Sequence, residues 1–342
     1  MAKRMIAAAL CLLLAGTPVL AQEEGFEAEL AARFQPPPSG WQVPRTPWGD
    51  PDLRGKWPVD YLAQTPRERP VQYGTRAFLN DSEYAAAFED AQAQLDRYDE
   101  EIHVGVMSMG HWAERGHPLH QSSMVVEPTN GRYPPLTALG QQWRAEEHTS
   151  WNTEVFDDLD DFGIFDRCLT RGMPSSMLPG AYNAGIQIFQ SPGLVAISLE
   201  MIHETRLVHL DGNTPPPADV QFDLGYSIGH WEGDTLVIET TNFRPGMSMG
   251  PAPNSASLRV VEHLTLMNPD QVRYEAWVSD PLVMEGHYKL DIPWLRDSAY
   301  GMFEYACHEG NVQVRGYIMS TSPRYAAERE ATWAAHDAEG TH

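Results

Sequence analysis

The stretch Leu258-Arg259-Val260-Val261-Glu262-His263-Leu264-Thr265-Leu266 decides the fold class of this chain. Apolar and polar side chains alternate along it, which is the period of a half-buried β-strand. The alternation places Glu262 on the same face as the leucines and Val260. A carboxylate among aliphatic side chains costs free energy unless it is protonated, paired or facing a polar cavity. The stretch therefore predicts a β-rich fold with an ionisable group on an inward face.

Short alternating segments continue on both sides of this strand, from about residue 183 onward. Turn residues separate them, among them Asp211-Gly212, Glu232-Gly233-Asp234 and Asn268-Pro269-Asp270. Consecutive strands with short turns favour an antiparallel meander that closes to hide its edges. We therefore predict a mainly β fold, a meander closing into a lipocalin-like β-barrel of about 8–10 strands. The expected strands lie near 185–190, 194–200, 203–210, 226–231, 235–242, 257–266, 271–279, 284–291, 300–307 and 312–318.

The segments that flank the predicted barrel differ from it in amino-acid composition and in predicted secondary structure. Residues 22–155 are rich in proline, which cannot donate to a sheet, and are expected to wrap over a folded body. They contain two predicted helices, one capped by Asp81 and one over about 137–147 capped by Thr137. Residues 156–322 form the predicted barrel domain, and 323–342 a C-terminal helix and tail. The sequence leaves open whether 22–155 is a separate domain.

Residues 1–21 are typical of a cleaved signal peptide. Lys3 and Arg4 precede an apolar run from Ile6 to Leu14, and a small-residue cleavage site ends at Ala21. The apolar run is too short to span a bilayer, and no later run is long enough. We therefore expect a periplasmic or secreted protein without a membrane span.

Removal of this peptide changes the net charge and the number of cysteines. It leaves 22 basic and 47 acidic residues, a net charge of −25, which disfavours nucleic acids and anionic membranes as partners. It also leaves Cys168 and Cys307 as the cysteines of the mature chain. In an oxidising compartment two cysteines are most simply joined in one disulfide.

The candidate catalytic residues are His203, Glu262, His308 and Arg206. The two histidines, each on a predicted strand face or its end, would form an acid/base pair, and Glu262 would serve as a second base or orient a histidine. Arg206 would stabilise an oxyanion. The alternative for Glu262 is a buried ion pair with Arg259, Arg206 or Arg273 that joins strands. For the histidines the alternatives are a hydrogen-bonded strand residue and a turn cap.

Four further residues are candidates for substrate binding, namely Tyr182, Asn183, Asn242 and Arg259. Their polar groups would orient the head of a ligand whose apolar body contacts an aliphatic wall. No cofactor is predicted. A separate histidine-rich stretch, with His111, His117, His120 and Glu114, is a possible metal patch, although loop histidines are usually solvent-exposed.

Several phrases occur together in this chain: TPWGDPDL at 46–53, MIHETR at 201–206, WEGDTLVIETTNF at 231–243 and YACHEGN at 305–311. Together they resemble a family of exported bacterial proteins, and the resemblance extends over about residues 46–311. It implies export and supplies no reaction. The stretch 103–120 departs from the pattern, which lowers the weight of a metal patch there.

Three hypotheses for function follow from these residues. The favoured one is an exported enzyme that uses cavity acid/base residues on a small, partly apolar organic molecule, in lyase, isomerase or hydratase chemistry. The second is a lipocalin-like periplasmic binding protein for an apolar small molecule. The third is a metal-dependent hydrolase with His203, His308 and Glu262 as ligands of a divalent metal. The sequence leaves substrate and oligomeric state open.

Overall fold

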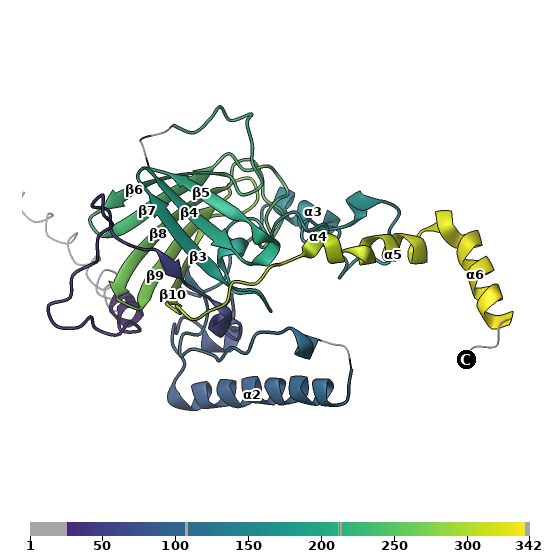
Figure 1. Cartoon of the computed structure of the whole chain (residues 1–342), viewed down its shortest axis with the longest axis horizontal. Coiled ribbons are helices and arrows are strands. Elements are labelled where there is room, and N and C mark those ends of the chain that lie inside the picture. The colour runs from purple at the N-terminus through teal and green to yellow at the C-terminus, as the bar shows by residue number, and fades with distance from the viewer. Residues whose placement is uncertain (1–25, 107–108, 211, 213, 339–342) are drawn as a thin grey trace, which may run out of the picture.

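One curled β-sheet forms the centre of the molecule (Figure 1). The computed structural model describes residues 26–106, 109–210, 212 and 214–338, so the predicted signal peptide lies outside the described residues. Ten strands pair in the order β1-β3-β4-β5-β6-β7-β8-β9-β10-β2. The mainly β class is confirmed, and the curled sheet forms a half-barrel.

The two edge strands, β1 and β2, are the shortest of the sheet, and β8, β9 and β10 are the longest. Neighbouring strands are antiparallel except β5 and β6, which run parallel and pair through only two residue positions. The strand bounds are β1 Gly55–Lys56, β2 Val125–Glu127, β3 Ile186–Ser191, β4 Leu194–Leu199, β5 Thr205–His209, β6 Tyr226–Glu232, β7 Thr235–Thr241, β8 Arg259–Asn268, β9 Gln271–Ser279 and β10 His287–Leu295.

The prediction of a closed, purely antiparallel meander was wrong in two respects. The edge strands β1 and β2 come from the proline-rich segment and do not pair with each other, so the sheet stays open. The expected strands at 300–307 and 312–318 are instead an irregular segment and helices. Tyr300 and Phe303 donate hydrogen bonds to Glu200 rather than to a strand. Tyr317 packs on Phe156, so tertiary contacts override the β propensity of Val312 and Val314.

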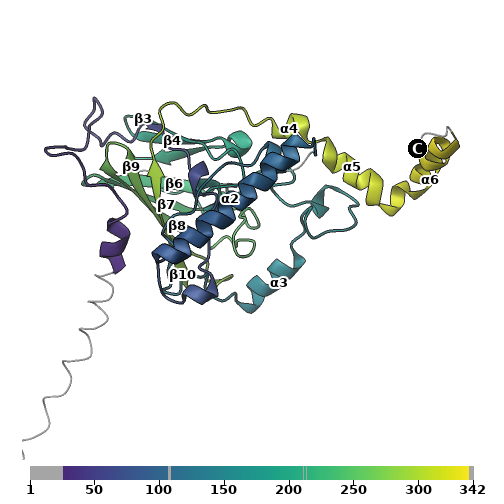
Figure 2. The same cartoon turned by 90° about the horizontal axis from the view of Figure 1, so that it is seen from below.

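The helices lie outside the sheet (Figures 1 and 2). Asn80, not Asp81, caps α2 and forms a capping box with Glu83, whereas Thr137 caps α3 as predicted. The tail helices α5 and α6 project away from the sheet. No helix in the described part of the chain is long and apolar enough to cross a membrane. The helix bounds are α2 Asp81–His103, α3 Ala138–Glu146, α4 Cys307–Gly310, α5 Val312–Thr321 and α6 Ala326–Ala338.

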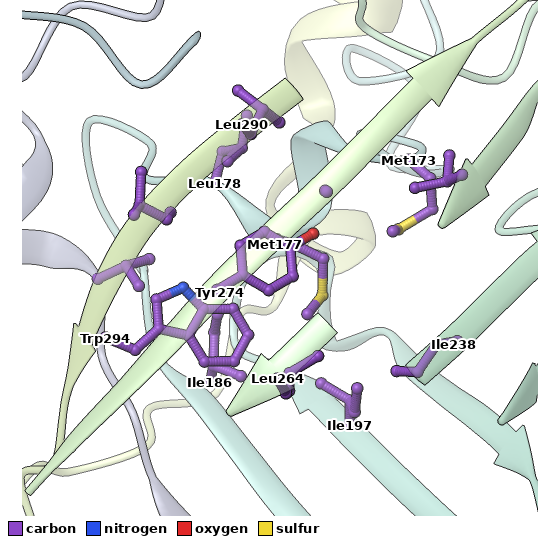
Figure 3. Packing of buried hydrophobic residues seen from close by; sticks show 14 of the residues in the cluster. Met173, Met177, Leu178, Ile186, Ile197, Ile238, Leu264, Tyr274, Leu290 and Trp294 are labelled. Carbon is purple, nitrogen blue, oxygen red and sulfur yellow. The ribbon is translucent and has the colours of Figure 1, made fainter. Parts of the chain in front are cut away.

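Apolar side chains fill the inner face of the curled sheet (Figure 3). Tyr274 stacks on Trp294 with 4.6 Å between ring centroids, and Met173 and Met177 reach into the same cluster from the loop before β3. Trp57, from the proline-rich segment, is fully buried there. The early segment therefore shares one core with the sheet.

The predicted disulfide between Cys168 and Cys307 is confirmed, with 5.8 Å between the two Cα atoms. It joins the loop before η5 (Ser175–Met177) to the start of α4, across 139 positions of sequence. It therefore ties the segment that leads to the C-terminal helices to the body of the protein.

Replacing both cysteines by serine should lower the free energy of unfolding by about 2–5 kcal/mol, because the crosslink restricts the unfolded chain. Urea denaturation followed by far-UV circular dichroism measures this change. An unchanged unfolding midpoint and slope in the double variant would show that the disulfide does not stabilise the fold.

Candidate functional site

Glu262 is fully buried on β8 and forms a bidentate ion pair with Arg206 of β5. The guanidinium nitrogens donate to the two carboxylate oxygens at 3.0 and 2.6 Å, and the Tyr274 hydroxyl donates to the first at 2.9 Å. Arg206 also donates to Ser227 and Thr240. The network therefore connects β5, β6, β7, β8 and β9.

Burial and the charge of Glu262 both act on the pKa values of Arg206 and Tyr274. Burial opposes the charge of Arg206, but the adjacent Glu262 raises the pKa of the guanidinium above its ordinary value. Burial, and then the carboxylate charge, raises the pKa of the Tyr274 hydroxyl well above its usual range. The structure thus matches the alternative interpretation of Glu262, an ion pair that joins strands.

Replacing Arg206 by methionine leaves a buried carboxylate without its partner, so we expect the free energy of unfolding to fall by about 3–5 kcal/mol. The double variant Arg206→Met/Glu262→Leu should recover much of that loss, since both charges are gone. Chemical denaturation of both variants measures the difference. A single variant within about 1 kcal/mol of wild type would contradict the structural role.

Two of the predicted substrate-binding residues have structural partners elsewhere. The Arg259 Nε donates to Glu239 at 2.6 Å, and both side chains are half exposed on the outer side of the sheet. Asn242 donates through Nδ2 to the carbonyls of Pro216, Pro217 and Val220, and so fixes the loop between β5 and β6. Within the described structure, neither residue contacts His203 or His308.

The two candidate histidines do come together, although 105 positions separate them in sequence. Their ring centroids lie 6.4 Å apart with an edge-on orientation, and both side chains are exposed. His203 Nδ1 lies 2.8 Å from the carbonyl oxygen of Tyr305. Because a carbonyl oxygen only accepts hydrogen bonds, Nδ1 carries the proton. In the neutral ring the lone pair is then on Nε2, the form used by a general base or a metal ligand.

The backbone at His203 is left-handed, which corrects the prediction of a strand residue there. His203 ends the 3₁₀ helix η6 (Met201–His203), with φ of 60° at Ile202 and 46° at His203. A β-branched residue in this region is strained. The side chains of Met201 and Ile202 are buried, and the His203 amide donates to the Glu200 carbonyl at 3.0 Å. These contacts hold the strained turn in place.

A buried arginine and two tyrosines adjoin the histidine pair. Tyr182 and Tyr305 stack with 6.2 Å between centroids, and both are half-buried. Arg171 is 7% exposed and donates to the carbonyls of Leu178 and Pro179. Burial, and then repulsion from Arg67, lowers the pKa of the Arg171 guanidinium to about 9. The structure thus adds a cationic group beside Tyr182 and Tyr305, which the sequence did not indicate.

Asn183 binds two carboxylates, those of Glu200 and Glu114, and Asp60 lies close enough to act on Glu114 through its charge. The Asn183 Nδ2 donates to Glu200 at 2.7 Å, and its backbone amide donates to Glu114 at 2.9 Å. Burial, and then the charge of Asp60, raises the pKa of Glu114 above its ordinary value. Burial also raises the pKa of Asp60. Asn183 therefore orders acidic side chains, whereas the sequence suggested substrate binding.

The raised pKa values of Glu114 and Asp60 mean that these two groups stabilise the fold more in mild acid than at neutral pH. A carboxyl group whose folded pKa exceeds its unfolded value binds more protons in the folded state, so its stabilising contribution is lost as pH rises through the folded pKa.

Glu114→Gln keeps the acceptor for the Asn183 amide and removes the charge. We expect this variant to be more stable than wild type at pH 7, with the difference vanishing below pH 4.5, the ordinary pKa of Glu114. Thermal unfolding across this range measures it; a constant difference at all pH values would contradict the titration.

The histidines of the stretch considered above as a metal patch have other contacts in the structure. His117 stacks on Phe88 and His120 on Tyr84, so both pack against α2. His111 Nε2 lies 2.9 Å from the carbonyl oxygen of Val106. Among the residues that the structure describes, no group of three or more His, Cys, Asp or Glu side chains is arranged to hold a metal ion.

Two Gly-x-Ser-x-Gly pentapeptides, at 225–229 and 246–250, could be mistaken for nucleophile elbows. Such an elbow needs a strand–turn–helix setting that exposes the serine. Ser227 lies buried on β6 and bonds with Thr240, and buried Ser248 donates to the Met173 carbonyl. Neither serine is placed as an exposed nucleophile.

No protein-family model, no curated protein and no solved structure matches this chain. The functional argument therefore rests on the geometry of the site. That geometry defines a mainly β half-barrel protein with an exposed pair of histidines held at one end of its sheet by a loop and a disulfide-bonded segment.

Proposed function

We propose that this chain is an exported enzyme that transfers protons on a small, partly apolar organic molecule, in lyase, isomerase or hydratase chemistry. The observation that carries the proposal is the hydrogen bond from His203 Nδ1 to the Tyr305 carbonyl, which leaves the Nε2 lone pair at an exposed position. A general base needs this arrangement, a free ring nitrogen and a fixed ring orientation.

His308 is the second proton-transfer group in this proposal. With 6.4 Å between ring centroids, one small substrate can reach both imidazoles through hydrogen bonds of about 3 Å. His203 abstracts a proton through Nε2, and His308 donates one to the departing or rearranging group. The stacked Tyr182 and Tyr305 rings offer an apolar surface beside them.

The structure supports roles for Glu262 and Arg206 that differ from the catalytic ones in the sequence hypothesis. Both side chains are buried, and Arg206 binds both carboxylate oxygens of Glu262 within the sheet. For the same reason Glu262 does not complete a facial metal site with the histidines, so the metal-hydrolase alternative loses its third ligand. The lipocalin-like alternative, a ligand held within a closed barrel, is weakened because core side chains fill the inner face of the sheet.

Export is part of the same proposal. The signal-peptide pattern of residues 1–21, the resemblance of the 46–311 motifs to exported bacterial proteins and the Cys168–Cys307 disulfide all support a periplasmic or secreted location. The acidic surface supports a small molecule as the partner, in preference to nucleic acid.

The proposal predicts that wild-type protein catalyses exchange of carbon-bound protons with solvent on at least one member of a panel of small carbonyl and hydroxy compounds. Mass spectrometry after incubation in deuterated water detects such exchange without knowledge of the full reaction. His203→Ala should lower the exchange rate by about 10²–10⁴-fold, and His308→Gln should also lower it, because each removes a proton-transfer group.

The matched control is His230→Gln, which removes an exposed histidine on β6 that belongs to no part of the site. Its exchange rate should equal that of wild type. Equal rates in wild type, His203→Ala and His308→Gln on a compound that the protein turns over would contradict the assignment.

A further inference from the structure

A recess lies at the disulfide, between the loop 150–168 and residues 304–317. Its volume is about 500 Å³, within the range of sites that hold small molecules. It shares Tyr305 with the histidine site but includes neither histidine in its lining. The chemistry of its wall differs from that of the proton-transfer site.

Aromatic side chains make up a third of the residues that line this recess. Trp151, Phe162, Phe165, Tyr305 and Tyr317 all line the recess. Phe162 is fixed by stacking on Phe156 at 4.3 Å, whereas Trp151 is 86% exposed and has a free indole face. A cluster of aromatic faces with negative quadrupole potential is the surface that proteins use to bind alkylammonium groups.

The charged residues of the lining are all acidic. Asp166 and Glu304 line the recess, and its lining contains no lysine, arginine or histidine. Asp166 accepts only from neutral donors, the Ser150 hydroxyl and the backbone amides of Ser150 and Gly163. Glu304 is exposed and has no hydrogen bond or ion pair with any described residue. The neighbouring Arg167 is directed to Asp160 instead.

We propose that this recess is a binding site for a small organic cation bearing a quaternary or protonated amine. The aromatic walls would contact the alkyl groups of the cation, and Asp166 and Glu304 would supply the opposite charge. Neutral ligands of the same shape gain only the apolar contact, and anions are repelled. This inference does not depend on proton transfer by His203.

The test uses choline and its neutral isostere 3,3-dimethylbutan-1-ol as probes, titrated into the full-length mature protein and followed by ligand-observed NMR. Choline should bind saturably at one site, at least about tenfold more tightly than the isostere. Trp151→Leu and Glu304→Gln should each weaken choline binding by about three- to fivefold, the scale of one exposed cation–π or charge contact.

Two matched variants complete the design. Glu309→Gln removes an exposed carboxylate of α4 outside the recess, and Trp112→Leu removes an exposed tryptophan near α2. Both should bind choline as wild type does. Lack of saturable choline binding, equal affinity for the isostere, or wild-type affinity in both Trp151→Leu and Glu304→Gln would each overturn the proposal.

Discussion

The buried ion pair between Arg206 and Glu262 is the contact on which the sheet depends most. Its network reaches five successive strands and crosses the junction of β5 and β6, where the backbones pair at only two positions. Side-chain hydrogen bonds thus reinforce the shortest pairing in the interior of the sheet. Because β5 directly follows η6, the same network also anchors the turn that presents His203.

Buried ionisable groups fix the chain in place, whereas the two histidines of the candidate site are exposed. Glu200 holds Tyr300 and the Phe303 amide near the start of β3, and the disulfide holds Cys307. The segment between these two anchors carries Tyr305, whose carbonyl orients His203. The buried charges therefore position the chain that carries the two exposed imidazoles to which we assign proton transfer.

Alternation identified most strands of the sheet because one face of each is buried, as Leu258, Val260 and Leu264 show. It failed at His203, since a left-handed backbone is set by the buried Ile202 and not by any period in the sequence. The alternation also wrongly predicted a strand at 312–318, where the packing of Tyr317 on Phe156 favours a helix. From the sequence, three arginines were possible partners for Glu262. Only the order of the strands in the sheet shows which of them lies beside it. The meeting of His203 and His308 depends on the same long-range contacts.

The tautomer of His203 tests the account most directly, because proton transfer by this residue requires a free Nε2. Nitrogen-15 NMR of the imidazole groups at a pH where His203 is neutral distinguishes the two ring nitrogens. The account predicts a protonated Nδ1 and an unprotonated Nε2 for His203, with that preference reduced when the Cys168–Cys307 disulfide is removed. A neutral His203 protonated mainly on Nε2 would contradict it.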